Sequence, residues 1–196
     1  FDYGMGNLAS VEKAVRHLAH PCRRQTDLAD ATRLILPGVG AFAAAMDALG
    51  DRAAQIVAFA RAGHPVLGIC LGMQLLFEVG EEHGRQAGLG VLAGSVVRMP
   101  AVGVKIPHVG WNGLETPPGA SRFHSPMLAG IESGEQVYFV HSYHCVPAEP
   151  SDVAAVSRHG IDFGAAVQRE NDWGCQFHPE KRGATGLRTL ENFLQW

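Results

Sequence analysis

Cysteine and charge are scarce in this sequence. Its four cysteines, Cys22, Cys70, Cys145 and Cys175, are too few and too scattered for the disulfide scaffold of a small secreted domain. The net charge of −3 excludes a generally basic surface for nucleic acid. No apolar run approaches the ~18 residues that a membrane span needs, and no signal-peptide pattern opens the chain. We therefore expect a cytoplasmic protein that binds neither nucleic acid nor a membrane.

Apolar side chains and glycine, by contrast, are abundant. Hydrophobic residues make up 46% of the 196 positions and 24 are glycine, which is enough apolar surface for a core and excludes a disordered chain. Domains commonly span ~100–200 residues, so we expect residues 1–196 to form a single domain.

The first half of the chain alternates short apolar runs with helical patterns. Apolar residues recur at helical spacing over 8–18, for example, and form a short run over 34–36. The expected elements are, in order, a strand stub over 1–4, a helix over 8–18, a strand over 34–36, helices over 42–49 and 53–62, a strand over 66–69 and a helix over 73–77. This alternation predicts a parallel sheet with helices on both faces.

In the second half, Gly, Pro and Asp separate a series of short strands. The expected strands cover 96–99, 137–140, 153–156, 165–167 and 173–177, and a final helix presents Leu187, Leu190 and Leu194 on one face. The predicted fold class is therefore α/β, with a central, mostly parallel sheet flanked by helices and an antiparallel or mixed strand extension in the second half.

The strongest chemical signal is Gly68-Ile69-Cys70-Leu71-Gly72, between an expected buried strand and an expected helix. This is the G-x-nucleophile-x-G elbow with sulfur in place of a hydroxyl. The helix N-terminus favours a thiolate, and the N–H of Leu71 is placed to donate to a developing oxyanion. The alternative is a structural core cysteine, but the strand–turn–helix context favours a nucleophile.

A nucleophilic cysteine needs a base, and Phe177-His178-Pro179-Glu180 offers one. Alternation along the preceding strand puts His178 on the face opposite Cys175, and Pro179 stops the strand. Glu180 is close enough along the chain to accept a hydrogen bond from the imidazole. A structural histidine is the alternative, and the strand-end position beside a carboxylate favours catalysis modestly.

The loop Pro37-Gly38-Val39-Gly40 follows the neighbouring strand and lies at the carboxyl edge of the predicted sheet, where α/β folds bind ligands. Its glycines allow backbone N–H groups to approach a substrate closely. An ordinary strand-to-helix turn would explain the same pattern, and only its place beside Cys70 favours a functional role.

Two competing signals point elsewhere. The segment Gly4-Met5-Gly6-Asn7-Leu8-Ala9 fits a loose dinucleotide fingerprint, although Asp27 is a weak match to the acidic residue that should follow. A zinc site could in principle form from His141, His144, Cys145, Cys175 and His178, but no pair has regular Cys-x-x-Cys spacing.

Together, the motifs resemble those of the triad-type (class I) glutamine amidotransferases, and among them the glutaminase subunits of imidazole glycerol phosphate synthases. The wider class shares the cysteine elbow and His-Pro-Glu. The subgroup is indicated by D-Y-G-M-G-N (2–7), P-G-V-G-A-F (37–42), P-H-V-G-W-N (107–112) and Y-F-V-H-S-Y (138–143).

The resemblance implies hydrolysis of glutamine to glutamate and ammonia, without a cofactor or metal. Cys70 would attack the amide, His178 would move the proton, and Glu180 would orient His178. Val39 and Leu71 would supply oxyanion N–H groups, and the substrate contacts would be Gly38, Gln74, Ser142 and Tyr143.

The resemblance also implies a heterodimer with a (β/α)8-barrel cyclase subunit, which uses the ammonia in histidine biosynthesis. The family's interface positions fall on Asn7, Trp111, Tyr138 and Lys181. The family has a strand before D-Y-G-x-G-N, so we expect the N-terminal strand here to be incomplete. The alternatives are another class I glutaminase, serving a different synthase, and a non-catalytic dinucleotide-binding module.

Overall fold

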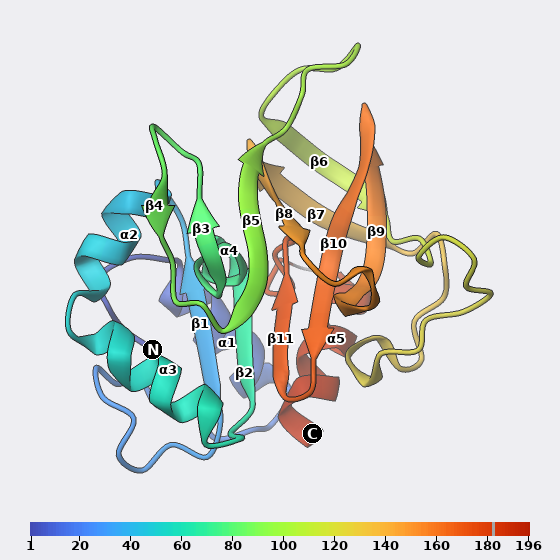
Figure 1. Ribbon diagram of the computed structural model, residues 1–196. Helices are drawn as coiled ribbons and strands as arrows, with labels where there is room; N and C mark the ends of the chain where they lie inside the picture. The colour runs from blue at the N-terminus through green and yellow to red at the C-terminus, as the bar shows by residue number, and fades with distance from the viewer. Residues whose placement is uncertain (182) are drawn as a thin grey trace.

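In the computed structural model, which describes residues 1–181 and 183–196, a five-stranded sheet runs through the centre of the molecule (Figure 1). In spatial order its strands are β1 (Leu34–Gly38), β2 (Val66–Cys70), β11 (Asp172–Cys175), β10 (Ile161–Arg169) and β9 (Val153–His159). The first three run parallel, and β10 and β9 are antiparallel to their neighbours. β2 is buried along its whole length, as expected for a strand flanked by strands and covered by helices.

Helices cover both faces of this sheet. One apolar cluster joins it to α1 (Leu8–His17) and α5 (Ala184–Gln195). A second cluster joins the opposite face to α2 (Phe42–Leu49), α3 (Arg52–Arg61) and the short α4 (Leu71–Leu75). The two clusters separate because alternate residues of β2 point to opposite faces.

Two smaller sheets form the strand extension. One has the order β4 (Gln86–Ala87), β3 (Phe77–Gly80), β5 (Leu92–Arg98) and β8 (Tyr143–Pro147), and the other pairs β6 (His108–Gly113) with β7 (Gln136–His141). Short 3-10 turns cover Pro126–Leu128 and Pro150–Asp152. The predicted fold class, a helix-flanked sheet with a mixed extension, is therefore confirmed.

Three local expectations were wrong. Residues 1–4 form no strand: the Phe1 amino group donates to the Ile35 carbonyl, and Gly4, at φ 87°, then turns the chain away towards α1. The helix expected over 73–77 is α4, which ends at Leu75 because Phe77 begins β3 and pairs there with Leu92 of β5.

The last strand ends at Cys175 rather than Phe177, because its backbone changes partners. The N–H of Gln176 still donates to Ala165 in β10, whereas the N–H of His178 donates to the Tyr138 carbonyl in β7. This crossing brings the end of β11 to the smaller β6–β7 sheet.

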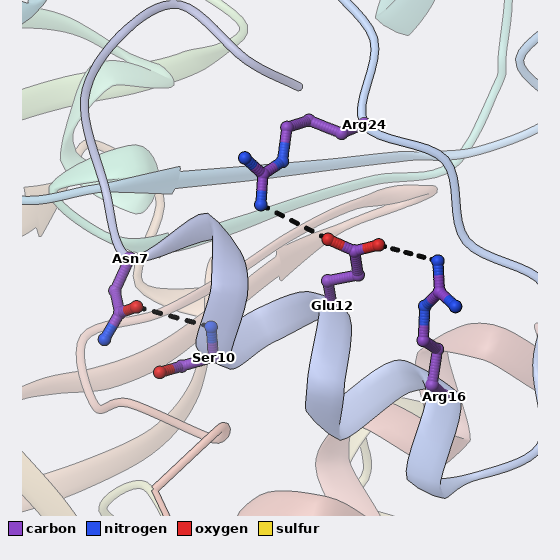
Figure 2. Close-up of polar contacts among 5 residues, drawn as sticks. All are labelled: Asn7, Ser10, Glu12, Arg16 and Arg24. Carbon is purple, nitrogen blue, oxygen red and sulfur yellow. Dashed lines mark hydrogen bonds and ion pairs between the residues drawn. The ribbon is translucent and has the colours of Figure 1, made fainter.

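Figure 2 shows how the start of the first helix is fixed. The side chain of Asn7 caps α1 by accepting from the Ser10 N–H at 3.3 Å, and Glu12 pairs with Arg16 at 2.8 Å and Arg24 at 3.3 Å. These pairs are solvent-exposed and contribute little stability, but they tie the loop after α1 back to the helix. In the part of the chain described here, no helix has the length and apolar character required to cross a membrane.

Candidate active site

Cys70 lies at the junction of β2 and α4 in a strained backbone conformation. Its φ of 55° is in the left-handed region, which a residue with a side chain adopts at a cost of about 1–3 kcal/mol. Gly72 makes the turn possible, because a Cβ there would collide with the Leu36 carbonyl oxygen. Such strain persists only where the surrounding packing enforces it, and it is typical of a nucleophile elbow.

His178 and Glu180 form a buried pair beside this elbow. The imidazole Nδ1 lies 2.9 Å from Glu180 Oε1, and the two side chains are 6% and 2% exposed. Because the carboxylate accepts the Nδ1 proton, Nε2 is the nitrogen left for chemistry. It makes no hydrogen bond within residues 1–181 and 183–196, and catalytic hydrogen bonds commonly tighten only when substrate binds.

The pKa of His178 is raised to about 10. Burial lowers this pKa, but the nearby Cys70 sulfur and the hydrogen-bonded Glu180 carboxylate together outweigh burial. The imidazole is therefore protonated at neutral pH and loses its proton as the pH rises through about 10.

This origin of the pKa shift predicts the behaviour of Glu180→Gln. Without the carboxylate, the pKa of His178 should fall, so the alkaline limb of kcat/KM for glutamine, the substrate that the resemblance implies, should move to lower pH. We expect partial activity, because the base itself remains. The profile would be measured from about pH 6 to about pH 11; an alkaline limb that stays in place would show that Glu180 does not control His178.

Two glutamines extend the site beneath the thiol. Gln176 donates from Nε2 to Cys70 Sγ at 3.7 Å and is fully buried. Gln74 Nε2 donates to Gln176 Oε1 at 3.0 Å and to the Tyr143 carbonyl at 3.1 Å. The sequence analysis missed Gln176, although period-2 alternation places it on the same side of the strand as His178.

A cavity of about 400 Å³ opens in front of these groups. The residues that line it are Val39, Gly40, Cys70, Leu71, Gln74, Glu82, Pro107, Val140, His141, Ser142, Tyr143 and His178. It thus gathers both expected oxyanion residues and three of the four expected substrate contacts. The fourth, Gly38, is buried against Tyr3 and Gly72 rather than lining the cavity.

Glu82 is a second site residue that the sequence analysis missed. Its Oε2 accepts from the N–H of Phe42 at 2.7 Å, which caps the start of α2, and the side chain also lines the cavity. No motif marks it, since it comes from the loop after β3, and only the fold brings that loop to Cys70.

Trp111, Tyr138 and Lys181 lie together at the surface. Trp111 and Tyr138 pair across β6 and β7 with ring centroids 5.7 Å apart, and Lys181 Nζ lies 5.9 Å from the Tyr138 ring. Asn7 shares no hydrogen bond or ring contact with them in the described part of the chain.

The same outer face of β6 and β7 carries two exposed valines. Val109 and Val140 lie opposite each other in the register, and Val140 also lines the cavity. We call Val109, Trp111, Tyr138, Val140 and Lys181 the docking face. It is an apolar surface that reaches the mouth of the cavity, and exposed apolar patches of this kind mark interaction sites.

Neither competing signal gains support. Among residues 1–181 and 183–196, no three His, Cys, Asp or Glu side chains are arranged so that they could hold a metal ion. The dinucleotide alternative leaves the strained Cys70 and the buried His178–Glu180 pair without a role. A larger cavity, of about 700 Å³, lies between α1 and the segment 20–35. Leu8 and Asp27 of the loose dinucleotide pattern line it, but the glycines Gly4 and Gly6 and the residues expected to act on glutamine do not.

Comparison with known proteins agrees with this geometry. The family "Glutamine amidotransferase class-I" matches residues 5–196. "Imidazole glycerol phosphate synthase subunit HisH" of Desulfitobacterium hafniense (strain DSM 10664 / DCB-2) is 50% identical over 200 residues, covering 100% of this chain and 92% of the relative. The protein with the same name from Moorella thermoacetica (strain ATCC 39073 / JCM 9320) is 48% identical over 198 residues, covering 98% and 91%.

Solved structures share the fold at low sequence identity. "Structure of PurLQS from Thermotoga maritima" aligns with a TM-score of 0.74 at 19% identity, covering 100% of this chain and 95% of that one. "Crystal structure of glutamine amidotransferase" aligns with a TM-score of 0.73 at 19% identity, covering 97% and 94%.

Proposed function

The chain belongs to the class I glutamine amidotransferases and, within them, to the HisH subunits of imidazole glycerol phosphate synthase, and from that premise we propose how its residues act. It is a glutaminase of histidine biosynthesis. We propose that Cys70, His178 and Glu180 form its catalytic triad. The observation that supports this most is the strained Cys70 at the base of a cavity that His178 also lines.

In the proposed reaction, Cys70 Sγ attacks as a thiolate at the side-chain carbonyl carbon of glutamine, while His178 carries a proton. The N–H groups of Leu71, at the start of α4, and Val39 stabilise the oxyanion, since the first N–H groups of a helix have no partner within the helix. His178 transfers its Nε2 proton to the amide nitrogen, the C–N bond breaks, and ammonia leaves a thioester on Cys70. Water then attacks the thioester with His178 accepting its proton, and the C–S bond breaks. This releases glutamate and restores the thiolate beside the protonated His178.

Glutamine carries an α-ammonium group as well as the amide, and the cavity offers one carboxylate for it. Among the lining residues, only Glu82 has an anionic side chain. We propose that Glu82 holds the ammonium while Gln74, Ser142 and Tyr143 contact the rest of the substrate. Gly38 supports the loop from beneath.

Glu82→Gln is therefore expected to raise the KM for glutamine about 10-fold or more, because a charged hydrogen bond contributes about 1.5–3 kcal/mol. The value of kcat should change much less, since the ammonium is remote from the reacting amide. Steady-state kinetics with glutamine provide the test, and Glu81→Gln, next to it but exposed and outside the cavity lining, is the matched control. An unchanged KM in Glu82→Gln would contradict this role.

We propose that the docking face binds the (β/α)8-barrel cyclase subunit. Trp111 is 48% exposed at its centre, and an exposed tryptophan on an apolar face is a common interface hot spot. A partner seated here would cover the cavity mouth through Val140, so ammonia would pass to the partner rather than to solvent. Asn7, which caps α1, stays a predicted interface residue without a contact to this face.

Trp111→Ala should weaken association with the cyclase subunit about 30-fold or more, the effect of losing a hot-spot side chain. Isothermal titration with purified cyclase would measure this, with the equally exposed Trp196 as control. If Trp111→Ala and Trp196→Ala bind equally well to the cyclase, the docking face is wrongly placed.

The loop of residues 37–40 could control activity, because the backbone around Val39 can change its orientation. Gly38 is held in place by its packing against Tyr3, whose hydroxyl donates to the Pro37 carbonyl at 2.9 Å. The exposed Val39 and Gly40, the latter at φ 106°, are free of that restraint. We propose that docking selects the orientation in which the Val39 N–H faces the cavity.

Glutamate release therefore tests the proposed function. It would be measured for the chain alone, with the cyclase subunit, and with the cyclase plus its ligand. Losing one oxyanion donor costs ~10²–10³ in rate, so we expect turnover to rise by about that factor from the first mixture to the third. Equal turnover in all three would show that no switch exists, and no glutamate release in any would overturn the function. A cytoplasmic location stays a prediction.

A further inference from the structure

A pair of histidines lies just outside the proposed site. His108 and His141 face each other in the register of β6 and β7, and both are buried, at 2% and 6% exposure. His108 Nδ1 lies 3.1 Å from His141 Nε2. Phe139, Phe163 and the stacked ring of His159 enclose the pair. Only His141 lines the cavity; His108 does not.

The contacts of His141 determine where the protons lie. Its Nδ1 is 2.9 Å from the Tyr143 carbonyl, which can only accept, so Nδ1 carries a proton. Burial lowers the pKa of His141 to about 3 and that of His108 to about 4, so both rings are neutral at pH 7. The Nε2 of His141 is then an acceptor, and His108 must donate to it from Nδ1. His108 Nε2 is left without a proton or a partner among the described residues.

A chain of hydrogen bonds connects the histidine pair to Cys70 in the proposed active site. The Tyr143 carbonyl that accepts from His141 also accepts from Gln74 Nε2. Gln74 donates as well to Gln176, which donates to the thiol of Cys70. The donor and acceptor roles are consistent along the whole path, and the Tyr143 carbonyl, which can only accept, joins the His141 ring to the Gln74 amide.

We propose that His108 is a positioning residue for glutamine, and that its Nδ1–H, donated to His141 Nε2, locks the orientation of the His141 ring. The locked ring holds the Tyr143 carbonyl, and with it Gln74, in the geometry that receives the substrate. This inference rests on the proposed glutaminase function. His108 itself does not contact the substrate in this proposal. Because it acts through Gln74, a proposed substrate contact, loss of His108 should weaken glutamine binding more than it slows the chemical step.

The test compares two substitutions of His108 in the full chain bound to its cyclase partner. His108→Leu removes the donor and leaves a buried acceptor unsatisfied, so we expect the KM for glutamine to rise about tenfold with kcat within about twofold. His108→Asn restores an N–H near the Nδ1 position and should return KM to within about threefold of the original. Phe163→Leu, which removes only packing against both histidines, is the structural control and should leave KM unchanged.

A wild-type KM in His108→Leu would overturn the proposal, as would equal KM increases in all three variants, because packing alone would then explain them. Histidine ¹⁵N spectra of the full chain at neutral pH give a second readout that does not depend on turnover or on the folding of His108→Leu. We expect the proton on Nδ1 in both rings, and a proton on Nε2 of either ring would also overturn the proposal. Absence of wild-type turnover would instead count against the glutaminase function, and the spectra would still test the pair.

Discussion

Replacing Cys70 with alanine or serine is expected to lower glutamine hydrolysis by at least about 10³-fold without unfolding the protein, since removing a catalytic nucleophile commonly has effects of this size or larger. The thiol is the only proposed group that forms a covalent bond with the substrate. Its strained backbone is set by Gly72 and the packing around it rather than by the sulfur. The circular dichroism spectrum should therefore stay the same while glutamate release disappears.

The other three cysteines provide matched controls. Cys145 and Cys175 are fully buried, and burial raises the pKa of both thiols well above the ordinary value, which makes them poor nucleophiles. Burial also raises the pKa of Cys22. Alanine at each position should retain glutaminase activity. Retained activity in Cys70→Ala, or an equal loss in one of the controls, would contradict the assignment.

The second large effect is expected in His178→Ala. Proton transfer by a positioned side chain typically contributes ~10²–10⁴-fold, and here the same imidazole serves as acid and then as base. We expect a fall in kcat within that range and slower alkylation of Cys70, because the protonated ring no longer stabilises the sulfur anion. His17→Ala, an exposed position on α1, is the control.

Glutamate release and the rate of iodoacetamide alkylation at Cys70 would both be measured. If His178→Ala alkylates at the wild-type rate, the imidazole and the thiol do not interact, and another residue must supply the proton. If His17→Ala loses as much activity as His178→Ala, the loss of activity in His178→Ala is not evidence for a catalytic role of His178.

Local sequence was enough to predict the elements that surround the nucleophile. Short β-branched and leucine-rich runs over 34–36 and 66–69 are too short for helices. Pro37 and Gly38 end the first run, and the second lies between Pro65 and Cys70. The elbow at Cys70 and the His178–Glu180 pair could also be predicted from the sequence, because each lies within a few consecutive residues.

Other features depend on contacts between distant segments, which spacing does not reveal. In strand β6 the alternating apolar residues Val109 and Trp111 face outward, and the opposite face carries histidine, glycine and asparagine. It is a strand because β7 pairs with it. Glu82 reaches the cavity only because β3 returns beside α2. The contact between His108 and His141 joins positions 33 residues apart, through a register that no local pattern sets.

Labelling of the intact chain by an electrophilic glutamine analogue, such as a diazoketone, tests most directly whether Cys70 attacks glutamine. The modified residue would be identified by mass spectrometry of peptides, with and without an excess of glutamine. We predict one adduct, on Cys70, that glutamine prevents and that Cys70→Ser does not form. An adduct on Cys22, Cys145 or Cys175 instead, or labelling of Cys70 that glutamine fails to prevent, would contradict the proposed active site.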